Sequence, residues 1–310
     1  MKYRRLPELG IVSKTGGFTY KTLSFCLQGL LKTFPFLKSF VIGHSVLGKP
    51  IYMLAAGSGQ NRVMYNAAHH ANEWITSMVM TEFIGQYMTA IAQGTMICGH
   101  NALDIYKKTT IYFVPMVNPD GVDLVTGNIQ AGETYESAKK MNYSNLPFPD
   151  EWKANINGVD LNLQYPADWE IAKKIKKELG YNRPGPRDFT GISPLCEPES
   201  RAMTQATDAV DPSLTLSLHT QGRIIYWRYA DKLPFRSYEI ACQLSDASGY
   251  PCEDTPYISG HAGYKDWFIQ KYNRPGYTIE CGAGENPLPL SQFGEIYRDV
   301  SKILALSAIL

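Results

Sequence analysis

The stretch NAAHHANEWIT at residues 66–76 carries two histidines and a glutamate that could bind a metal ion. His70 and Glu73 have the spacing H-x-x-E, which places an imidazole and a carboxylate about one helical turn apart, near enough to bind a single ion. His69 and Glu73 would also be one turn apart, so the spacing does not choose between the two histidines. The alternative is a histidine pair at a helix N-terminus beside an exposed glutamate, because H-x-x-E alone is a weak motif. A metal site therefore needs a third ligand.

The best candidate for a third ligand is His219. A catalytic zinc site commonly uses two histidines and one glutamate, with water in the fourth position. His219 ends the apolar run LTLSLHT, and strand ends are where α/β sheets collect their chemistry. His44 and His100 lie in turn-like polar segments, and His261 is the remaining candidate. The alternative for His219 is a hydrogen-bonded histidine at a strand end.

A second carboxylate, Glu280, could act as a base. Zinc lowers the pKa of its water, but peptide hydrolysis also needs a group that takes the proton and later delivers it to the leaving amine. A carboxylate that does not bind the metal suits both steps. Glu280 follows the apolar run YTI, so its side chain is a charge at the end of a strand expected to be buried. We predict Glu280 as this base; the alternative is a buried ion pair.

An alternation of strands and helices must position these residues. Short β-branched or aromatic runs alternate with helical patterns, which predicts an α/β fold with a mainly parallel or mixed sheet between helices. Two regions, 120–157 and 164–194, are rich in Pro, Asn, Gly and Asp, and we expect irregular loops there that wall a cleft. The expected strands are 39–44, 50–56, 62–67, 109–117, 214–220, 223–229 and 276–282, and the expected helices are 20–33, 73–91, 199–209, 236–248, 264–272 and 292–306.

The balance of charges excludes some classes of partner. With 30 Lys and Arg against 29 Asp and Glu, the net charge is +1, so no global field attracts nucleic acid or an anionic membrane surface. A small-molecule or peptide substrate fits this composition better. The hydrophobic content of 44% is that of a packed globular protein. No repeat or linker divides the chain, which predicts one domain over residues 1–310.

The cysteines and the N-terminal residues bear on location. The six cysteines include no CxxC pair, which predicts free thiols and a reducing cytoplasm. The start MKYRRLPELGIVSK is basic, but no apolar segment follows it, unlike a standard signal peptide. The longest apolar runs, within 77–92, include Glu82 and Gln86 and are amphipathic, so we expect no membrane span. The alternative to the cytoplasm is a forespore or wall-associated location reached by a non-classical route.

Several motifs together resemble one enzyme family. AHHANEWIT is similar to the metal motif of the zinc carboxypeptidases of the carboxypeptidase A type (M14), in which a His, two further residues and a Glu lead into Trp-Ile-Thr. NPDG at 118–121, GVDLN at 158–162, SLHT around His219 and YTIE ending at Glu280 follow in the order of that family. The resemblance covers nearly the whole chain. It implies a single domain in which helices sandwich a mixed eight-stranded sheet.

The resemblance also implies roles for the candidate residues. His70, Glu73 and His219 would bind one zinc ion per chain, and Glu280 would be the general base. Glu73 and the Trp-Ile-Thr that follows it fix the register, so His70 is the implied ligand. His69 would then lie beside the site as a structural or supporting group.

Other positions match the family motifs less closely. Asp160 matches the carboxylate that orients the first histidine ligand. Lys153 falls where digestive members have an arginine that polarises the scissile carbonyl, and Tyr257 approximates the mobile tyrosine that closes over the substrate. Asn162 is followed by Leu163, where digestive members have the arginine that completes a clamp on the terminal carboxylate of the substrate. Because leucine cannot bind a carboxylate, such a clamp needs another cation here.

The longer phrases GVDLNLQYPADWE, HTQGRIIYW and GHAGYKDWFIQKYNRPGYTIE are closer to a bacterial branch of the family. These γ-D-glutamyl-L-diamino acid peptidases cut the bond between D-glutamate and diaminopimelate or lysine in cell-wall peptides. Several of them carry N-terminal wall-binding repeats, whereas we expect residues 1–35 to form only a helical lead-in, which favours soluble muropeptides as substrates. Arg223, Arg228 and Lys265 are cations that could replace the missing clamp, or they could be solvated surface charges.

The function expected from the sequence is therefore zinc-assisted hydrolysis of a γ-D-glutamyl-diamino acid bond. One alternative is a conventional C-terminal carboxypeptidase acting on L-peptides, which would need the clamp that Leu163 cannot supply. Another is a catalytically silent peptide-binding module, against which the retention of three ligands and a base argues. The oligomeric state and the choice between diaminopimelate and lysine stay open.

Overall fold

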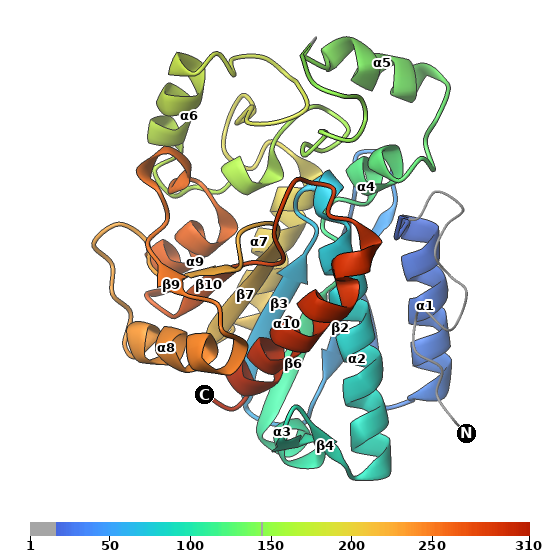
Figure 1. Ribbon diagram of the computed structural model, residues 1–310, viewed down its shortest axis with the longest axis vertical. Coiled ribbons are helices and arrows are strands. Elements are labelled where there is room, and N and C mark those ends of the chain that lie inside the picture. The colour runs from blue at the N-terminus through green and yellow to red at the C-terminus, as the bar shows by residue number, and fades with distance from the viewer. Residues whose placement is uncertain (1–16, 144) are drawn as a thin grey trace.

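An eight-stranded mixed sheet crosses the computed structural model, which describes residues 17–143 and 145–310 (Figure 1). The expectations for the extreme N-terminus, including the first part of the lead-in at 1–35, lie outside these residues. The fold class predicted from the sequence is confirmed. In spatial order the strands are β1 (Lys38–His44), β2 (Pro50–Ala56), β6 (Thr109–Val114), β3 (Asn61–Ala67), β7 (Leu214–His219), β10 (Gly276–Glu280), β8 (Ile224–Tyr226) and β9 (Cys252–Glu253); β4 (Met96–Ile97) and β5 (His100–Asn101) form a separate pair.

The four central strands, β6, β3, β7 and β10, run parallel to one another. Strands of this kind are covered on both faces and read as nearly continuous apolar or β-branched runs, as the fully buried strand β7 does. The register places Glu280 opposite His219, and Ala67 opposite Leu218. The carboxyl ends of β3, β7 and β10 therefore meet at one edge of the sheet, where α/β folds carry their sites.

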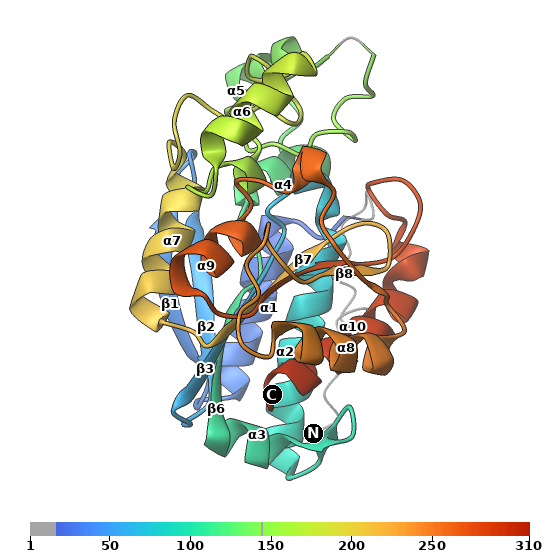
Figure 2. The same ribbon diagram turned by 90° about the vertical axis from the view of Figure 1, so that its left-hand side faces the viewer.

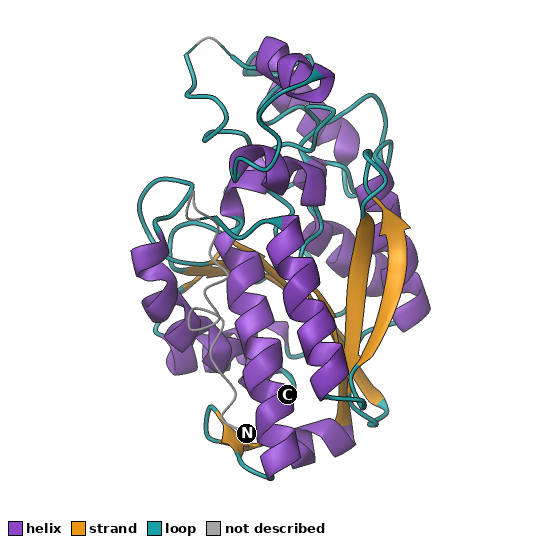
Figure 3. Cartoon of the chain, turned by 90° about the vertical axis from the view of Figure 1, so that its right-hand side faces the viewer, coloured by secondary structure: helices purple, strands orange, loops and turns teal. Residues whose placement is uncertain are grey.

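Helices cover both faces of the sheet. Figure 3 shows helices in front of the strands on one side, where α1, α2, α8 and α10 pack in a large apolar core. A second core lies on the other face, under α7 and α9. The bounds are α1 (Tyr20–Thr33), α2 (Ile75–Gln93), α3 (Ala102–Lys108), α7 (Pro198–Val210), α8 (Ser237–Ser248), α9 (Tyr264–Tyr272) and α10 (Phe293–Ser307), with 3-10 turns at η2 (Ala71–Glu73), η3 (Leu161–Leu163), η4 (Tyr257–Ser259) and η5 (Leu290–Gln292).

Helix α2 differs from the amphipathic helix expected from the sequence. Residues 75–84 are all buried, because α2 lies between β3 on one side and α1, α3 and α10 on the other. The polar side chain of Glu82 is buried with them and accepts a hydrogen bond of 2.8 Å from Gln86 Nε2. The helix ends at Gly94, whose φ of +64° suits a residue without Cβ. Within the described ranges, no helix is long and apolar enough to cross a membrane.

The two regions expected to be irregular contain three short helices, so that part of the prediction is wrong. They are α4 (Pro119–Val125), α5 (Glu133–Met141) and α6 (Trp169–Glu178). Helix α5 buries only Ala138, so its sequence carries little of the apolar periodicity by which a helix is recognised. Figure 2 shows α4, α5 and α6 gathered at one end of the molecule, beyond the sheet.

Candidate metal centre

The turn after β3 brings His70 and Glu73 together. Ala68 has a φ of +51°, and the chain then forms the single 3-10 turn η2 before α2 begins at Ile75. In a 3-10 turn the side chains at positions i and i+3 eclipse one another, which favours the pair His70 and Glu73 over His69 and Glu73. His70 Nδ1 lies 2.8 Å from Glu73 Oε1. The local structure thus makes the choice that spacing alone does not make.

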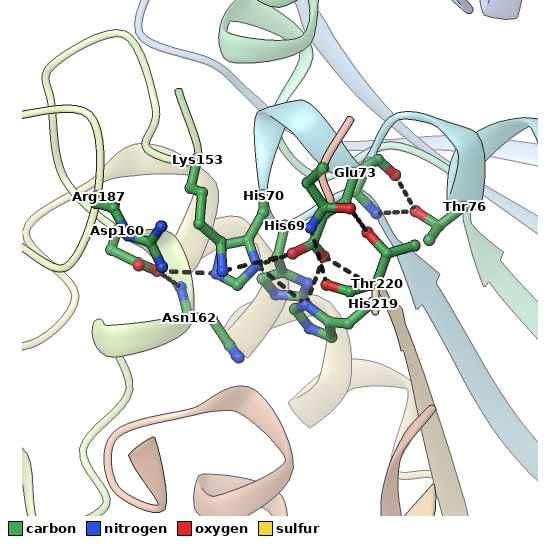
Figure 4. Close-up of polar contacts among 12 residues, drawn as sticks. His69, His70, Glu73, Thr76, Lys153, Asp160, Asn162, Arg187, His219 and Thr220 are labelled. Atoms are coloured by element: carbon green, nitrogen blue, oxygen red, sulfur yellow. Dashed lines mark hydrogen bonds and ion pairs between the residues drawn. The ribbon is translucent and has the colours of Figure 1, made fainter. Parts of the chain in front are cut away.

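His219 completes a cluster of three buried groups from two strand ends. Its Nδ1 atom lies 3.0 Å from Glu73 Oε2 and 3.2 Å from His70 Nδ1 (Figure 4). One ligand atom from each residue lies within 4.8 Å of the others, so the three could hold a metal ion. Two imidazoles and one carboxylate are the donor set of many catalytic zinc sites. The residues therefore fit zinc.

Asp160 fixes the orientation of His70. His70 Nε2 is hydrogen-bonded to Asp160 Oδ1 at 3.1 Å, which turns His70 Nδ1 toward Glu73 and His219. Asp160 also accepts from the backbone N–H groups of Asn162 and Asp188. Burial opposes ionisation of Asp160, but His70 outweighs it and the pKa of Asp160 lies below its ordinary value. The carboxylate expected to orient the first histidine is in contact with it.

His69 lies behind the cluster instead of in it. Its Nε2 atom is hydrogen-bonded to Tyr165 Oη at 2.8 Å, and its ring stacks on the His219 ring with centroids 5.8 Å apart. The residue is fully buried, and burial lowers its pKa well below the ordinary value, so the imidazole is neutral. His69 supports the His219 ring from the core side.

The NPDG segment secures the turn that carries the histidines. Asn118 Nδ2 donates to the carbonyl of His69 at 3.2 Å and to that of Ala154 at 3.0 Å. At Gly121 a Cβ atom would lie 2.7 Å from the Ala154 carbonyl oxygen and 2.8 Å from Ala71 Cβ, so no larger residue fits. The Asn and the Gly of this motif are therefore required by the local structure, the first for its hydrogen bonds and the second for its lack of Cβ.

Charges around Glu73 favour a carboxylate there. Lys153 Nζ lies 3.6 Å from Glu73 Oε1. Burial opposes ionisation of Glu73, but His70, Lys153 and His219 outweigh it and hold its pKa well below the ordinary value. Burial also disfavours the cation of His70, yet Glu73 and Asp160 raise the pKa of His70 to about 9. The cluster is a concentrated set of opposite charges.

Glu280 ends β10 beside His219. The two residues are paired in the parallel register, and Cys281 N donates to the His219 carbonyl at 2.7 Å. Burial, followed by the nearby charge of Glu73, raises the pKa of Glu280 to about 8. A carboxylate of raised pKa is a stronger proton acceptor than an ordinary one. Among the described contacts Glu280 has no hydrogen bond to the three-residue cluster, and it lines the same cavity as that cluster.

The cluster opens into a cavity of about 520 Å³. Lys153 and Asn162, both expected near the substrate, line it, and residues from the region 120–157 and from 164–194 form part of its wall, as predicted. The lining also includes residues that were not predicted from the sequence: Arg187, Tyr226 and the Thr220–Gln221 segment. For Arg187 there was a signal, because it lies in the segment NRPGPRD of a region expected to wall the cleft. The other lining residues include Glu151, Thr255, Ser259, Gly263, Lys265, Asp266, Thr278, Glu285 and Asn286.

Tyr257 and Arg223 lie elsewhere in this structure. The side chain of Tyr257 is 70% exposed, and its ring packs edge-on against His261, outside the cavity lining. Arg223 forms ion pairs with Glu295 and Asp299 of α10 and is not among the lining residues. Both residues have their contacts away from the cavity, and the substrate-binding roles expected for them stay predictions.

Arg228 and Leu163 also lie outside the cavity lining. Arg228 is paired with Asp254 at 2.6 Å, next to a smaller pocket. Leu163, at the position of the missing clamp arginine, is buried with 6% exposure. Of the three replacement cations expected from the sequence, only Lys265 lines the cavity.

Comparison with known proteins identifies relatives over nearly the whole chain. The family model described as zinc carboxypeptidase matches residues 25–302. A gamma-D-glutamyl-L-diamino acid endopeptidase 1 from Lysinibacillus sphaericus is 41% identical over 290 residues, which are 93% of this chain and 72% of that protein. The uncharacterized protein YqgT of Bacillus subtilis is 42% identical over 281 residues, covering 90% of this chain and 73% of its own length.

A solved structure shares the fold at low sequence identity. Bovine thrombin-activatable fibrinolysis inhibitor, in complex with tick carboxypeptidase inhibitor, superposes with a TM-score of 0.71 at 17% identity. The match covers 95% of this chain and 97% of the bovine one. At this identity the likeness concerns the arrangement of strands and helices and does not extend to the substrate.

Proposed function

The chain belongs to the zinc carboxypeptidase family, and from this membership we propose that it hydrolyses the amide bond between D-glutamate and a diamino acid in peptidoglycan-derived peptides. The observation that carries the proposal is the 41% identity, over 93% of the chain, to a gamma-D-glutamyl-L-diamino acid endopeptidase. The cluster of His70, Glu73 and His219 beside Glu280 supports the reaction class, because it combines a candidate metal site with a nearby carboxylate.

In the proposed mechanism, His70 Nδ1, Glu73 and His219 Nδ1 would hold zinc. When bound, the ion supplies a Lewis acid toward the scissile carbonyl and lowers the pKa of a water molecule. Asp160 keeps His70 in the tautomer whose Nδ1 is free to bind the metal. Each of these groups is buried, so water does not compete for them from behind the site.

Two further residues act on the substrate in this mechanism. Glu280 takes a proton from the attacking water at its carboxylate oxygen and returns it to the nitrogen of the leaving amine. Lys153, with its ammonium 3.6 Å from Glu73, brings positive charge to the place where negative charge develops on the carbonyl oxygen. Lys153 supplies this charge without the planar fork of an arginine.

The cavity offers three cations to a substrate with several carboxylates, beside five acidic residues: Glu73, Glu151, Asp266, Glu280 and Glu285. Lys153, Arg187 and Lys265 line it, whereas the clamp position Leu163 is buried and apolar. A γ-D-glutamyl-diamino acid peptide carries the free α-carboxylate of D-glutamate and at least one carboxylate on the diamino acid. This match supports a wall-derived peptide over an ordinary L-peptide, whose one terminal carboxylate is the group that the family clamps at the position of Leu163.

Digestion of defined muropeptides tests the proposed function. The zinc-loaded protein is incubated with L-alanyl-γ-D-glutamyl-diaminopimelate, and mass spectrometry locates the bond that is cut. We expect cleavage between D-glutamate and the diamino acid, with no cleavage of the same peptide joined through the α-carboxylate of glutamate. Release of C-terminal residues from ordinary L-peptides at a higher rate would instead favour the conventional carboxypeptidase.

Location in a reducing cytoplasm is part of the proposal. All six cysteines are free, and Cys26 and Cys281 are buried. Free thiols in this number suit a compartment where disulfides do not form. Fractionation of cells that express the tagged protein, with cytoplasmic and wall markers, would test this part separately from the activity.

A further inference from the structure

An ion pair at the start of α9 forms part of the cavity wall. Lys265 Nζ lies 2.5 Å from Asp266 Oδ1, and the two residues are 4% and 3% exposed. Both residues line the same cavity as the metal cluster and Glu280. Burial of two charges is costly unless each finds good partners, so a buried pair on a cavity surface calls for an explanation.

The Lys265 ammonium lies over the Tyr229 ring, 6.0 Å from its centroid, and has two hydrogen-bond acceptors among the described residues. The ammonium of Lys265 donates to Asp266 and to the carbonyl of Arg228 at 2.7 Å. An ammonium has three donors, and the described residues offer the third no acceptor within hydrogen-bond distance. Asp266 Oδ2 accepts from Gly263 N at 3.1 Å, which holds the carboxylate at the first turn of the helix. The pair is therefore held in place, and the Lys265 ammonium keeps one N–H group that has no hydrogen-bond acceptor among the described residues.

Asn162 connects the helix of the ion pair to the segment beside the metal cluster. Asn162 Oδ1 accepts from Tyr264 N at 3.0 Å, which attaches the start of α9 to the segment that carries Asp160. Figure 4 shows the Asn162 side chain pointing away from Asp160 and Lys153. Asn162, the ion pair and the metal cluster all line one cavity, so a substrate bound at the metal cluster lies in the same cavity as the ion pair.

Resting on the function proposed above, we propose that Lys265 and Asp266 bind the far end of the leaving diamino acid and select diaminopimelate over lysine. Diaminopimelate carries both an ammonium and a carboxylate on its distal carbon, whereas lysine carries an ammonium alone. The distal carboxylate is bound by Lys265 and the distal ammonium by Asp266. A lysine residue of the substrate would place its ammonium near the ammonium of Lys265, without a carboxylate to offset the repulsion. The preference for diaminopimelate comes from this difference.

Kinetics of two matched peptides test the proposal. L-alanyl-γ-D-glutamyl-meso-diaminopimelate and the corresponding L-lysine peptide are compared on zinc-loaded wild type and on Lys265→Met, which keeps the length of the side chain without its charge. We expect wild type to prefer the diaminopimelate peptide by about 10-fold or more in kcat/KM, which is about 1.4 kcal/mol. In Lys265→Met we expect a preference near one, with the loss confined to the diaminopimelate peptide and expressed mainly in KM.

A control from the same helix separates this effect from loss of any positive charge. Lys271 lies in α9, is paired with Asp208 on the exposed side and does not line the cavity. Lys271→Met should keep the wild-type preference. Because Lys265→Met leaves Asp266 buried without its partner, the double variant Lys265→Met with Asp266→Asn is measured as well; it removes both charges and keeps an acceptor for Gly263 N.

The outcomes distinguish this inference from the proposed function. Equal cleavage of the two peptides by wild type, or an unchanged preference in the single and double variants, contradicts the role of the ion pair and leaves the proposed function intact. Cleavage of neither peptide by the zinc-loaded wild type contradicts the proposed function and this inference with it.

Discussion

The two sides of the cavity are built in different ways. The metal rim, made of His70, Glu73, His219 and Glu280, stands at the ends of adjacent parallel strands between two apolar cores. The loop wall, residues 145–197, contributes no strand to the sheet. Its apolar residues are divided among a small cluster around Trp152, another around Trp169, and the second core, which Leu161 and Tyr165 join. The rim is therefore positioned by the strands themselves, and the wall by packing against the sheet and by local contacts.

Buried hydrogen bonds connect the segments of the loop wall to one another. Asn155 Nδ2 donates to Glu197 Oε2 at 2.7 Å, and Asn155 Oδ1 accepts from Val159 N at 3.1 Å. Trp152 Nε1 donates to the Asn155 carbonyl at 3.1 Å. Networks of this kind hold a unique shape only when every member is satisfied. The metal rim and the loop wall therefore rest on different kinds of support, so substitutions in the two regions should have different signatures.

The largest effect is expected from removal of a rim histidine. His70→Ala deletes a proposed ligand, so we expect loss of zinc from the purified protein and loss of hydrolysis. His69→Ala removes a neighbour that the structure places behind the rim; we expect it to keep zinc and to lower the free energy of unfolding by about 2–4 kcal/mol, because it leaves a cavity and an unpaired Tyr165 hydroxyl. Mass spectrometry of the bound metal and thermal unfolding would distinguish the two variants, because the first measures zinc content and the second measures stability. Zinc retained at full occupancy in His70→Ala would overturn this assignment.

A smaller effect is expected where the loop wall touches the rim. Asp160→Asn keeps the shape of the side chain but removes the charge that orients His70, so we expect zinc affinity to fall by about 10- to 100-fold. Competition with a chromogenic chelator measures this affinity. Asp150→Asn, at an exposed position of the same wall, serves as the control and should bind zinc as wild type does. Equal affinities in all three proteins would mean that the wall does not orient the ligand.

The smallest effect on catalysis is expected at Glu199, a buried residue of α7 that accepts a hydrogen bond from Asn155 of the loop wall. Burial raises the pKa of Glu199 to about 7 from an ordinary 4.5, and its Oε1 accepts from Val46 N. As pH rises from about 4.5 to 7, the unfolded chain loses this proton before the folded one, so the stability contributed by Glu199 falls and stays low above pH 7. Between pH 5 and 8 the loss should approach about 2–3 kcal/mol.

Glu199→Gln should remove this part of the pH dependence while leaving kcat unchanged. Denaturant unfolding of wild type and variant at pH 5 and pH 8 measures it, and the difference between the two proteins cancels the titration of other groups. Glu170→Gln, on the exposed side of α6, is the matched control. If the free energy of unfolding changes equally between pH 5 and pH 8 in wild type and in Glu199→Gln, then Glu199 is ionised in the folded protein across this range.

The sequence predicted the rim better than the wall. Helices 20–33 and 264–272 were predicted to the residue, and the apolar runs that end at His219 and Glu280 form adjacent strands. Periodicity and strand ends are local properties, so they can be read along the chain. Spacing alone left His69 and His70 tied, and only the resemblance to the family motifs predicted His70. In the structure a 3-10 turn, which an α-helical spacing does not describe, brings His70 to Glu73.

Other parts of the site depend on contacts between distant segments. Arg187 reaches the cavity from a Pro-rich segment whose path is set by hydrogen bonds such as Lys153 N to the Pro186 carbonyl at 2.7 Å. Arg223 was a plausible substrate cation in the sequence, but α10 supplies Glu295 and Asp299 to pair with it. Spacing along the chain cannot predict whether a given cation will pair with an acidic group of the substrate or with an acidic residue of another helix.

The central claim is that the metal rim performs the hydrolysis with Glu280 as its base. The direct measurement is kcat for Glu280→Gln on the γ-D-glutamyl-diaminopimelate peptide, at a zinc content matched to wild type, with Glu253→Gln on the exposed strand β9 as the control. We predict a fall of at least about 100-fold in kcat for Glu280→Gln, because the proton acceptor is lost while the metal ligands stay. A Glu280→Gln protein that turns over as fast as wild type would contradict the account.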